Sequence, residues 1–149
     1  MINSEIEKLN LAIVRGGKAY EEWDRHHKIA SYLTIILYEL LQTDKLTQKQ
    51  IVNRSNYPKQ SINKGIHKLQ QDGYLSLTID PNDNRLKYCQ LTPSGRRYAQ
   101  KKLASLIKAE NQVANKLGPE KMKQLVELNE EWSKTFWEVL EKEKRESNQ

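Results

Sequence analysis

The segment from Pro58 to Gly95 most constrains what this chain can fold into, because its pattern predicts a helix, a two-stranded hairpin and the start of another helix. Ile62, Ile66 and Leu69 recur four and three residues apart, which places them on one face of the first helix. The opposite face carries amides and amines and has no carboxylate before Asp72. Amides and amines pair with base edges in a major groove, and the lack of carboxylates avoids repulsion from phosphate. The segment therefore predicts a DNA-recognition helix.

The positive charge of the chain is concentrated around this segment. The formal net charge is +6, but residues 43–102 carry 12 Lys or Arg against 4 Asp or Glu, whereas the remainder carries 13 against 15. A basic segment of this kind is typical of a polyanion site, because each neutralised phosphate releases condensed counterions. A merely soluble basic protein would not explain the segregation.

Several classes of protein are disfavoured by the composition and motifs. The single cysteine, Cys89, cannot form an intramolecular disulfide, which fits a reducing cytosol. No apolar run reaches the roughly 18 residues that span a bilayer, and the N-terminal residues lack the features of a signal peptide. The chain has no nucleophile elbow, phosphate-binding glycine loop or zinc-protease motif. We therefore expect a cytoplasmic protein that is not an enzyme and has no cofactor.

Hydrophobic periodicity and capping residues predict a mainly α fold with one small β-hairpin. Thr47 and Gln50 have the spacing of a capping box. Pro58 suits the first position of a helix, and Gly73 suits the left-handed position that ends it. The expected elements are a helix from about residue 4 loosened by glycines 16 and 17, helices over 29–41, 47–54 and 58–71, strands over 75–79 and 87–91, and helices over 93–117 and 122–139, with a fraying tail from residue 141.

Two motifs behind the recognition helix carry a family resemblance. Asp83-Asn84-Arg85 stands at the hairpin tip, and Leu91-Thr92-Pro93-Ser94-Gly95 follows the second strand. An Asp-x-Arg, a strand and a Leu-Thr-x-x-Gly in this order resemble the MarR family of bacterial transcriptional regulators. The run from Tyr57 to Asn63 is also similar to the start of the recognition helix in Firmicutes members. The order of elements agrees over nearly the whole chain, whereas the motifs lie within residues 47–95.

This resemblance implies a winged helix-turn-helix domain over residues 28–100, with dimerisation helices over 1–27 and 101–149. It implies a homodimer on a pseudopalindromic operator, usually as a repressor, with the helix over 58–71 in the major groove and the wing in the adjacent minor groove. The apolar stripes of the flanking helices, which include Met122, Leu125, Trp132 and Phe136, exceed what a small winged domain can cover. A dimer would cover them.

The residues expected to contact DNA lie on the recognition helix and the wing. Gln60 or Asn63 could pair with adenine and Lys64 with guanine, while Arg85 suits a narrow minor groove. The alternatives are a solvated helix face and a hairpin that Asp83 and Arg85 merely stabilise. The candidate set is Lys59, Gln60, Ser61, Asn63, Lys64, His67, Lys68, Asn84, Arg85 and Lys87. A solvated face is the favoured interpretation of the basic residues after the second motif, Arg96, Arg97, Lys101 and Lys102.

Metal and oxidant sensing are both disfavoured. His26 and His27 are adjacent, but a metal site needs three or four convergent ligands, and the chain offers few others. Cys89 lies in a strand, where a small inward apolar residue is the simpler interpretation. By resemblance, oxidant-sensing members use a cysteine near the N-terminus, which this chain lacks.

The first two helices carry a cluster of aromatic residues and histidines, namely Tyr20, Trp23, His26, His27, Tyr32 and Tyr38. By resemblance, a small aromatic or lipophilic effector would bind between the dimerisation region and the winged domain. Ordinary packing at a dimer core is the favoured alternative. Two other functions stay open: a sequence-tolerant architectural DNA-binding protein without an effector, and a winged-helix adaptor between proteins.

Overall fold

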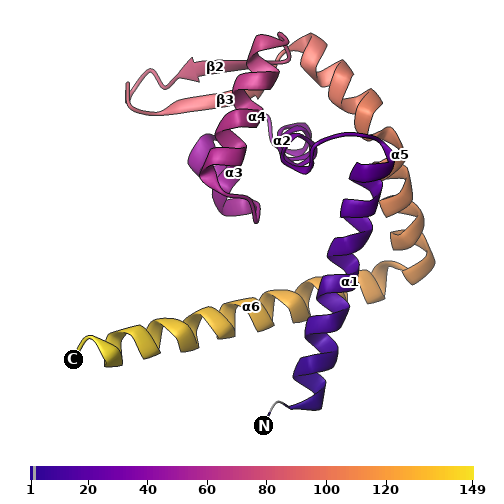
Figure 1. Cartoon of the computed structure of the whole chain (residues 1–149), viewed down its shortest axis with the longest axis vertical. Coiled ribbons are helices and arrows are strands. Elements are labelled where there is room, and N and C mark those ends of the chain that lie inside the picture. Colours follow the sequence, from indigo (N-terminus) through magenta and orange to yellow (C-terminus); the bar gives the residue numbers. More distant parts are fainter. Residues whose placement is uncertain (2) are drawn as a thin grey trace. The chain divides into compact units, whose positions relative to one another are not determined.

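The computed structural model describes residue 1 and residues 3–149. The described residues form α1 (Ser4–His26), α2 (Ser31–Gln42), β1 (Leu46–Thr47), α3 (Gln48–Arg54), α4 (Lys59–Gln71), β2 (Leu75–Ile79), β3 (Lys87–Leu91), α5 (Pro93–Leu117) and α6 (Pro119–Ser147) (Figure 1). The chain divides into two compact units, residues 1–104 and 105–149, so that α5 begins in the first unit and ends in the second. This mainly helical fold with a small antiparallel sheet is the expected winged-helix class.

The hydrophobic core lies in the first unit, where helices α2, α3 and α4 pack together against the sheet and the start of α5. Apolar residues recurring at helical spacing supply it, as the sequence predicts. The fully buried large side chains are Ile36, Leu37 and Leu40 of α2, Ile51 of α3, Ile62 of α4, Cys89 of β3 and Leu103 of α5. This core fixes α4 against the body of the unit and leaves its opposite face in solvent.

The sheet has three antiparallel strands in the order β1-β3-β2. Cys89 of β3 is paired with Leu46 on one side and Leu77 on the other. Strand β1 is absent from the sequence-based expectation, because two residues are too few to show an alternating pattern. Strand β2 occupies the expected residues 75–79, but of its apolar side chains only Leu75 is buried, whereas Leu77 and Ile79 are exposed. The outer part of the hairpin projects beyond the core (Figure 1).

Local capping agrees with the sequence at most helix ends. Thr47 and Gln50 form the expected capping box, and Gly73 has a φ of 77°. Gly118, with a φ of 85°, separates α5 from α6. Pro58 differs slightly from expectation, since it is the N-cap of α4 in an extended conformation and not its first helical residue.

Two helices are more continuous than expected. Gly16 and Gly17 do not interrupt α1, which runs unbroken from Ser4 to His26. Helix α6 continues to Ser147, although the charged tail from Glu141 was expected to fray. Oppositely charged residues one turn apart accompany this extension, with Nζ of Lys142 4.0 Å from Oε1 of Glu146. Such pairs stabilise an exposed helix by a few tenths of a kcal/mol each.

A buried polar contact joins α1 to α2. The hydroxyl of Thr34 donates a hydrogen bond of 2.5 Å to Oδ1 of Asp24, and both residues are buried. A buried carboxylate without a donor would be strongly destabilising, so this bond satisfies a group that α1 carries into the first unit. It fixes the end of α1 on the winged-helix core.

The second unit has no comparable core. Helix α6 has no buried residue, and seven of its apolar side chains are exposed: Leu125, Val126, Leu128, Trp132, Phe136, Trp137 and Val139. Helix α1, which belongs to the first unit, also exposes apolar side chains, namely Ile6, Leu11, Ile13, Val14 and Tyr20. No helix in the described part of the chain is both long and apolar enough to cross a bilayer.

Candidate nucleic-acid interface

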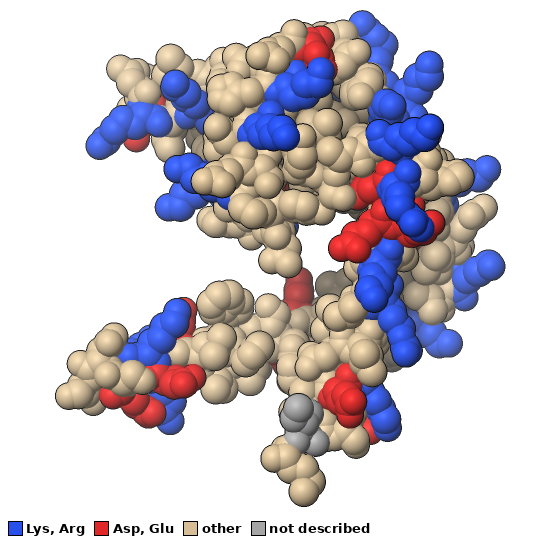
Figure 2. Space-filling view, in the orientation of Figure 1, with Lys and Arg blue, Asp and Glu red and all other residues tan. Residues whose placement is uncertain are grey.

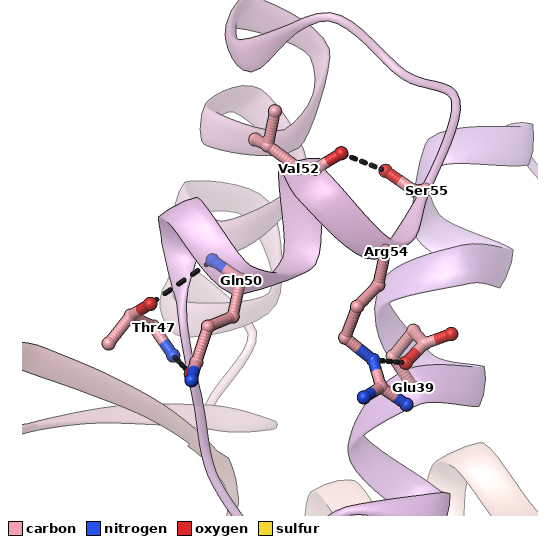
Figure 3. Close-up of polar contacts among 6 residues, drawn as sticks. All are labelled: Glu39, Thr47, Gln50, Val52, Arg54 and Ser55. Atoms are coloured by element: carbon pink, nitrogen blue, oxygen red, sulfur yellow. Dashed lines mark hydrogen bonds and ion pairs between the residues drawn. The ribbon is translucent and has the colours of Figure 1, made fainter. Parts of the chain in front are cut away.

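Helices α3 and α4 form a helix-turn-helix joined by the four residues from Ser55 to Pro58. At the start of α3, the Thr47 hydroxyl accepts from the Gln50 amide at 3.1 Å, and the Gln50 side chain accepts from the Thr47 amide at 2.8 Å (Figure 3). At its end, Nε of Arg54 donates to Oε2 of Glu39 on α2 at 2.5 Å (Figure 3). The short helix is therefore held at both ends, which fixes the turn that orients α4.

The approach of α4 to α2 depends on Gly65. A Cβ at this position would lie 2.5 Å from Cδ1 of Ile36 and 2.9 Å from Cδ2 of Tyr32. Real Cβ contacts are not that short, so only glycine allows the two helices to pack this closely. Because Gly65, Ile62, Ile66 and Leu69 are buried, the rotation of α4 about its axis is set.

The outward face of α4 carries the polar residues that the sequence nominates. Lys59, Gln60, Asn63, Lys64, His67 and Lys68 are exposed, and Ser61 is half-buried. Nζ of Lys64 lies 5.6 Å from the centroid of the Tyr32 ring, and Nζ of Lys68 lies 3.2 Å from Oδ2 of Asp72. The face therefore offers hydrogen-bonding groups and positive charge without an acidic residue in its first three turns.

The wing tip presents Arg85 on a backbone that two aspartates shape. The Asp80 carboxylate accepts from the backbone amide of Asn82 at 2.7 Å and from that of Asp83 at 3.2 Å. Asp83 then accepts from the backbone amide of Arg85 at 3.0 Å and from its Nε at 3.4 Å. The Arg85 side chain is 93% exposed, so this ion pair adds little stability and mainly directs the guanidinium. Asn84 and Lys87 are exposed beside it.

The outward face of α4 and the wing are both basic on the surface that Figure 2 shows. Lysine and arginine atoms lie over the hairpin and over α4, where few acidic atoms appear (Figure 2). The segment from residue 45 to residue 71, which spans the helix-turn-helix, contains no Asp or Glu. An anionic duplex would meet little repulsion there.

The Leu-Thr-x-x-Gly motif joins the end of α4 to the start of α5. The hydroxyls of Thr92 and Ser94 donate to the Gly73 carbonyl at 2.7 and 3.2 Å. A Cβ on Gly95 would lie 1.8 Å from the carbonyl oxygen of Tyr74, so a side chain there would separate the two segments. The sequence gives the motif only as part of the family resemblance, because a contact to a carbonyl 19 residues earlier leaves no local pattern.

The same joint includes a stacked aromatic pair. The rings of Tyr74 and Tyr98 lie 4.1 Å apart at an interplanar angle of 10°. Burial raises the pKa of Tyr98, and the charges of Tyr74 and Asp72 raise it further. Tyr98 is therefore neutral at physiological pH and acts as a packing element, which sequence reasoning did not assign to the site.

The structure also locates the residues considered for metal or oxidant sensing. Burial raises the pKa of the Cys89 thiol to about 11, which keeps it protonated and unreactive. Trp23 stacks on His27 with ring centroids 4.2 Å apart, and His26 contacts the His27 ring edge-on at 5.1 Å. Over the described residues, no three His, Cys, Asp or Glu side chains come together as a metal site.

The aromatic cluster expected near the first two helices is divided. Trp23, His26 and His27 lie together at the end of α1, whereas Tyr32 lies beside Gly65 and Lys64 of α4. Tyr20 is exposed on α1, and Tyr38 is half-buried on α2. The described contacts thus connect Tyr32 to α4 and place Trp23, His26 and His27 at the end of α1.

A helix-turn-helix followed by a wing defines the class of this fold, and comparisons with known proteins narrow it. Residues 34–86, from within α2 to the tip of the wing before β3, match the model of the MarR family. No curated protein sequence matches the chain.

Solved structures show the same fold over most of the chain. A MarR family regulator from Neisseria meningitidis, NMB1585, has a TM-score of 0.82 at 20% identity, covering 95% of this chain and 99% of that one. NadR, in a complex with 4-hydroxyphenylacetate, has a TM-score of 0.74 at 19% identity, covering 85% and 92%. The transcriptional regulator BldR from Sulfolobus solfataricus has a TM-score of 0.64 at 21% identity, covering 89% and 99%. The chain has the fold of the MarR winged-helix regulators.

Proposed function

We propose that the chain is a MarR-family transcriptional regulator that binds a pseudopalindromic operator as a homodimer, most simply as a repressor. The observation that carries this proposal is the exposed face of α4, which is polar, basic and free of carboxylates while its opposite face is locked in the core. A helix of this kind suits a major groove, and the basic hairpin beside it suits a minor groove. A chromosomal target would place the protein in the cytoplasm.

The proposed contacts follow from the exposed groups. Gln60, Asn63 and His67 lie on the outward face of α4 and are assigned to base edges, with Ser61 at their border. Lys59 and Lys68 are assigned to phosphates, and Lys64 to a base or a phosphate. Arg85 is assigned to the minor groove, where Asp83 orients it, and Asn84 and Lys87 are assigned to the flanking backbone.

The dimerisation helices are assigned to α1 and to the chain beyond residue 101. The exposed apolar residues of α1 and α6 form more apolar surface than a monomer usually leaves in water. A second copy would cover this surface and bring two recognition helices to adjacent major grooves. The winged helix-turn-helix over residues 28–100 would then act as the DNA-binding domain of each subunit.

A small aromatic anion is the proposed class of effector. NadR is described in complex with 4-hydroxyphenylacetate, and BpsR of Bordetella bronchiseptica is described as regulated in its DNA binding by 6-hydroxynicotinic acid. The aromatic and histidine side chains at the end of α1 offer stacking surfaces and donors for such a molecule. Binding would shift the population between dimers that fit the operator and dimers that do not.

The decisive experiment selects bound fragments from random genomic DNA with the full-length protein. We expect enrichment of a palindrome, and we expect Asn63→Ala to change the preferred bases at one position of each half-site. Asn111→Ala, which alters an exposed asparagine of α5, is the matched control and should leave the motif unchanged. Retention of duplex without any enriched motif would favour the architectural alternative, and no retention at all would favour the protein adaptor.

A further inference from the structure

The ring of Tyr32, near the start of α2, lies against the recognition helix α4. A Cβ at Gly65 would lie 2.9 Å from Cδ2 of Tyr32, so the ring packs directly on the backbone of α4 at this residue. Nζ of the neighbouring Lys64 lies 5.6 Å from the centroid of the same ring. The sequence places Tyr32 in an aromatic cluster of the first two helices, whereas these two contacts join it to the helix that faces DNA.

Lys64 lies at the border between the buried side of α4 and its outward face. Gly65 is buried against α2, whereas Lys64 is exposed. Successive residues of a helix are separated by about 100° around its axis, so the stem of Lys64 begins beside the surface that α2 covers. The lack of a side chain at Gly65 leaves room for the ring to reach this border.

The ring and the lysine differ in mobility. The half-buried Tyr32 ring is packed against Gly65, whereas the exposed Lys64 ends a flexible four-carbon stem. An ammonium group within about 6 Å of the centroid of an aromatic ring is attracted by the negative face of that ring. The ring is therefore the fixed partner of the pair, and the contact restricts where the ammonium group lies.

An aromatic partner also leaves the charge of the lysine available. Lys68, one turn further along α4, has Nζ 3.2 Å from Oδ2 of Asp72, and this carboxylate partly cancels its charge. The Tyr32 ring orients the ammonium group of Lys64 without supplying a negative charge that would repel an approaching phosphate. The two lysines of α4 are thus held by partners of different chemistry.

We propose that Tyr32 is a positioning residue for the DNA contact of Lys64, because its ring holds the ammonium group at the α2 border of the reading face. The proposal rests on the proposed function and deepens it, since it adds a residue outside the helix-turn-helix to the determinants of binding. A flexible side chain that is ordered only on binding lowers affinity by about two- to tenfold. Tyr32 would remove much of this cost before DNA arrives.

The test is a double-mutant cycle on operator DNA with the full-length protein, using Tyr32→Leu, Lys64→Met and the double variant. Leucine keeps an apolar side chain but has no π face, so Tyr32→Leu should weaken binding by about two- to tenfold in each subunit, or about four- to a hundredfold for a dimer. In the Lys64→Met background the same substitution should have no further effect, because no ammonium group remains to be positioned.

Two results of this cycle would overturn the proposal. An equal loss in both backgrounds would show that Tyr32 acts only by packing on α4. Tighter binding by Tyr32→Leu would show that the ring holds Lys64 away from DNA. If thermal unfolding shows that Tyr32→Leu is not folded at the assay temperature, Tyr32→Met takes its place in the cycle, because methionine adapts to irregular gaps.

Two control variants separate the ring from other features. Tyr32→Phe keeps the π face and should bind like the wild type, whereas a loss equal to that of Tyr32→Leu would assign the effect to the hydroxyl and contradict the proposal. Lys68→Met removes the lysine that pairs with Asp72. Combined with Tyr32→Leu, it should be additive within about twofold. A coupling as large as that of Lys64 would mean that the effect is not specific to the ring contact.

A readout without DNA tests the contact itself. The ring current of Tyr32 should move the NMR signals of the Lys64 Hε protons upfield of those of Lys68, and Lys64→Met assigns them by their disappearance. We expect the shift to persist in Tyr32→Phe and to vanish in Tyr32→Leu. Lys64 signals at the ordinary position for lysine in the wild type would reject the contact.

Failure of this proposal is distinguishable from failure of the proposed function. If no palindrome is enriched, the cycle is repeated on random duplex, where coupling between Tyr32 and Lys64 would support the positioning role while rejecting the regulator. Duplex binding without coupling would reject the role of Tyr32 alone. If the wild type binds no duplex, both are rejected, even where the ring-current shift is present.

Discussion

The two units of the chain bury their apolar residues to very different degrees. In residues 1–104, α2, α3 and α4 supply fully buried apolar side chains, with Ile36, Leu37, Leu40, Ile51 and Ile62 at 0% exposure. In residues 105–149, α6 has no buried residue, and Phe136 and Trp137 remain more than half exposed. The first unit therefore contains its own stabilising core, whereas the second unit exposes apolar side chains of the kind that an interface would bury. The two largest expected effects test this difference, and two smaller ones concern contacts within the first unit alone.

The largest effect is expected in the core of the first unit. Leu40→Ala removes a fully buried side chain and leaves a cavity, so it should lower the free energy of unfolding by about 2–5 kcal/mol. Chemical denaturation followed by circular dichroism measures this loss. Leu128→Ala is the contrasting variant, because Leu128 is exposed on α6 and its loss should leave the intrinsic stability of the first unit unchanged. Equal losses in both would show that the two units do not differ in this way.

The next effect concerns association. Replacing Trp132 and Phe136 with alanine removes two aromatic side chains whose rings lie 6.0 Å apart on α6. If this face is an interface, each truncation should weaken the dimer by about 2 kcal/mol, or roughly 30-fold in the dissociation constant. Sedimentation equilibrium over a concentration series gives the constant. An unchanged dissociation constant would remove α6 from the interface.

A smaller effect is expected where α4 meets α2. Gly65→Ala places a Cβ within 2.5 Å of Ile36, so overpacking should lower the stability by about 1–3 kcal/mol and weaken operator binding by tilting α4. Thermal unfolding and a duplex titration on the same sample measure both results. Gly17→Ala has nothing within 4 Å and lies inside α1, so it should instead stabilise by about 0.5–1 kcal/mol. A stabilising Gly65→Ala would contradict the tight contact.

The smallest effect at neutral pH concerns Cys89. Its pKa is raised from 9.0 to about 11 in the folded chain, so the native thiol should react with a disulfide reagent about a hundredfold more slowly than the unfolded thiol at pH 8. Because the unfolded thiol ionises first, the stability from this group is complete below pH 9 and is lost as the pH rises towards 11. Cys89→Ala should lack this alkaline loss in pH-dependent unfolding. A fast reaction of the folded protein with the disulfide reagent would show that the Cys89 thiolate is accessible, and would contradict this prediction.

Much of the fold was predictable because its signals are local. The capping box of Thr47 and Gln50 and the left-handed Gly73 each depend on a few neighbouring residues, and both are confirmed. The exposed polar face of α4 followed from periodicity alone. The DNA contacts assigned to that face stay a prediction.

The missing parts depend on long-range contacts. Strand β1 exists because Leu46 and Thr47 meet β3, which is distant in the sequence. The Asp24–Thr34 bond and the approach of α2 to Gly65 also join separate elements.

The joint at the Gly73 carbonyl has a mechanical consequence. One oxygen receives hydroxyl donors from Thr92 and Ser94, while Gly95 rests directly on the backbone of Tyr74. The end of α4 and the first turn of α5 are therefore held tightly against each other by these contacts. A rotation of the first turn of α5 would rotate the end of α4 as well, because the two segments share this joint.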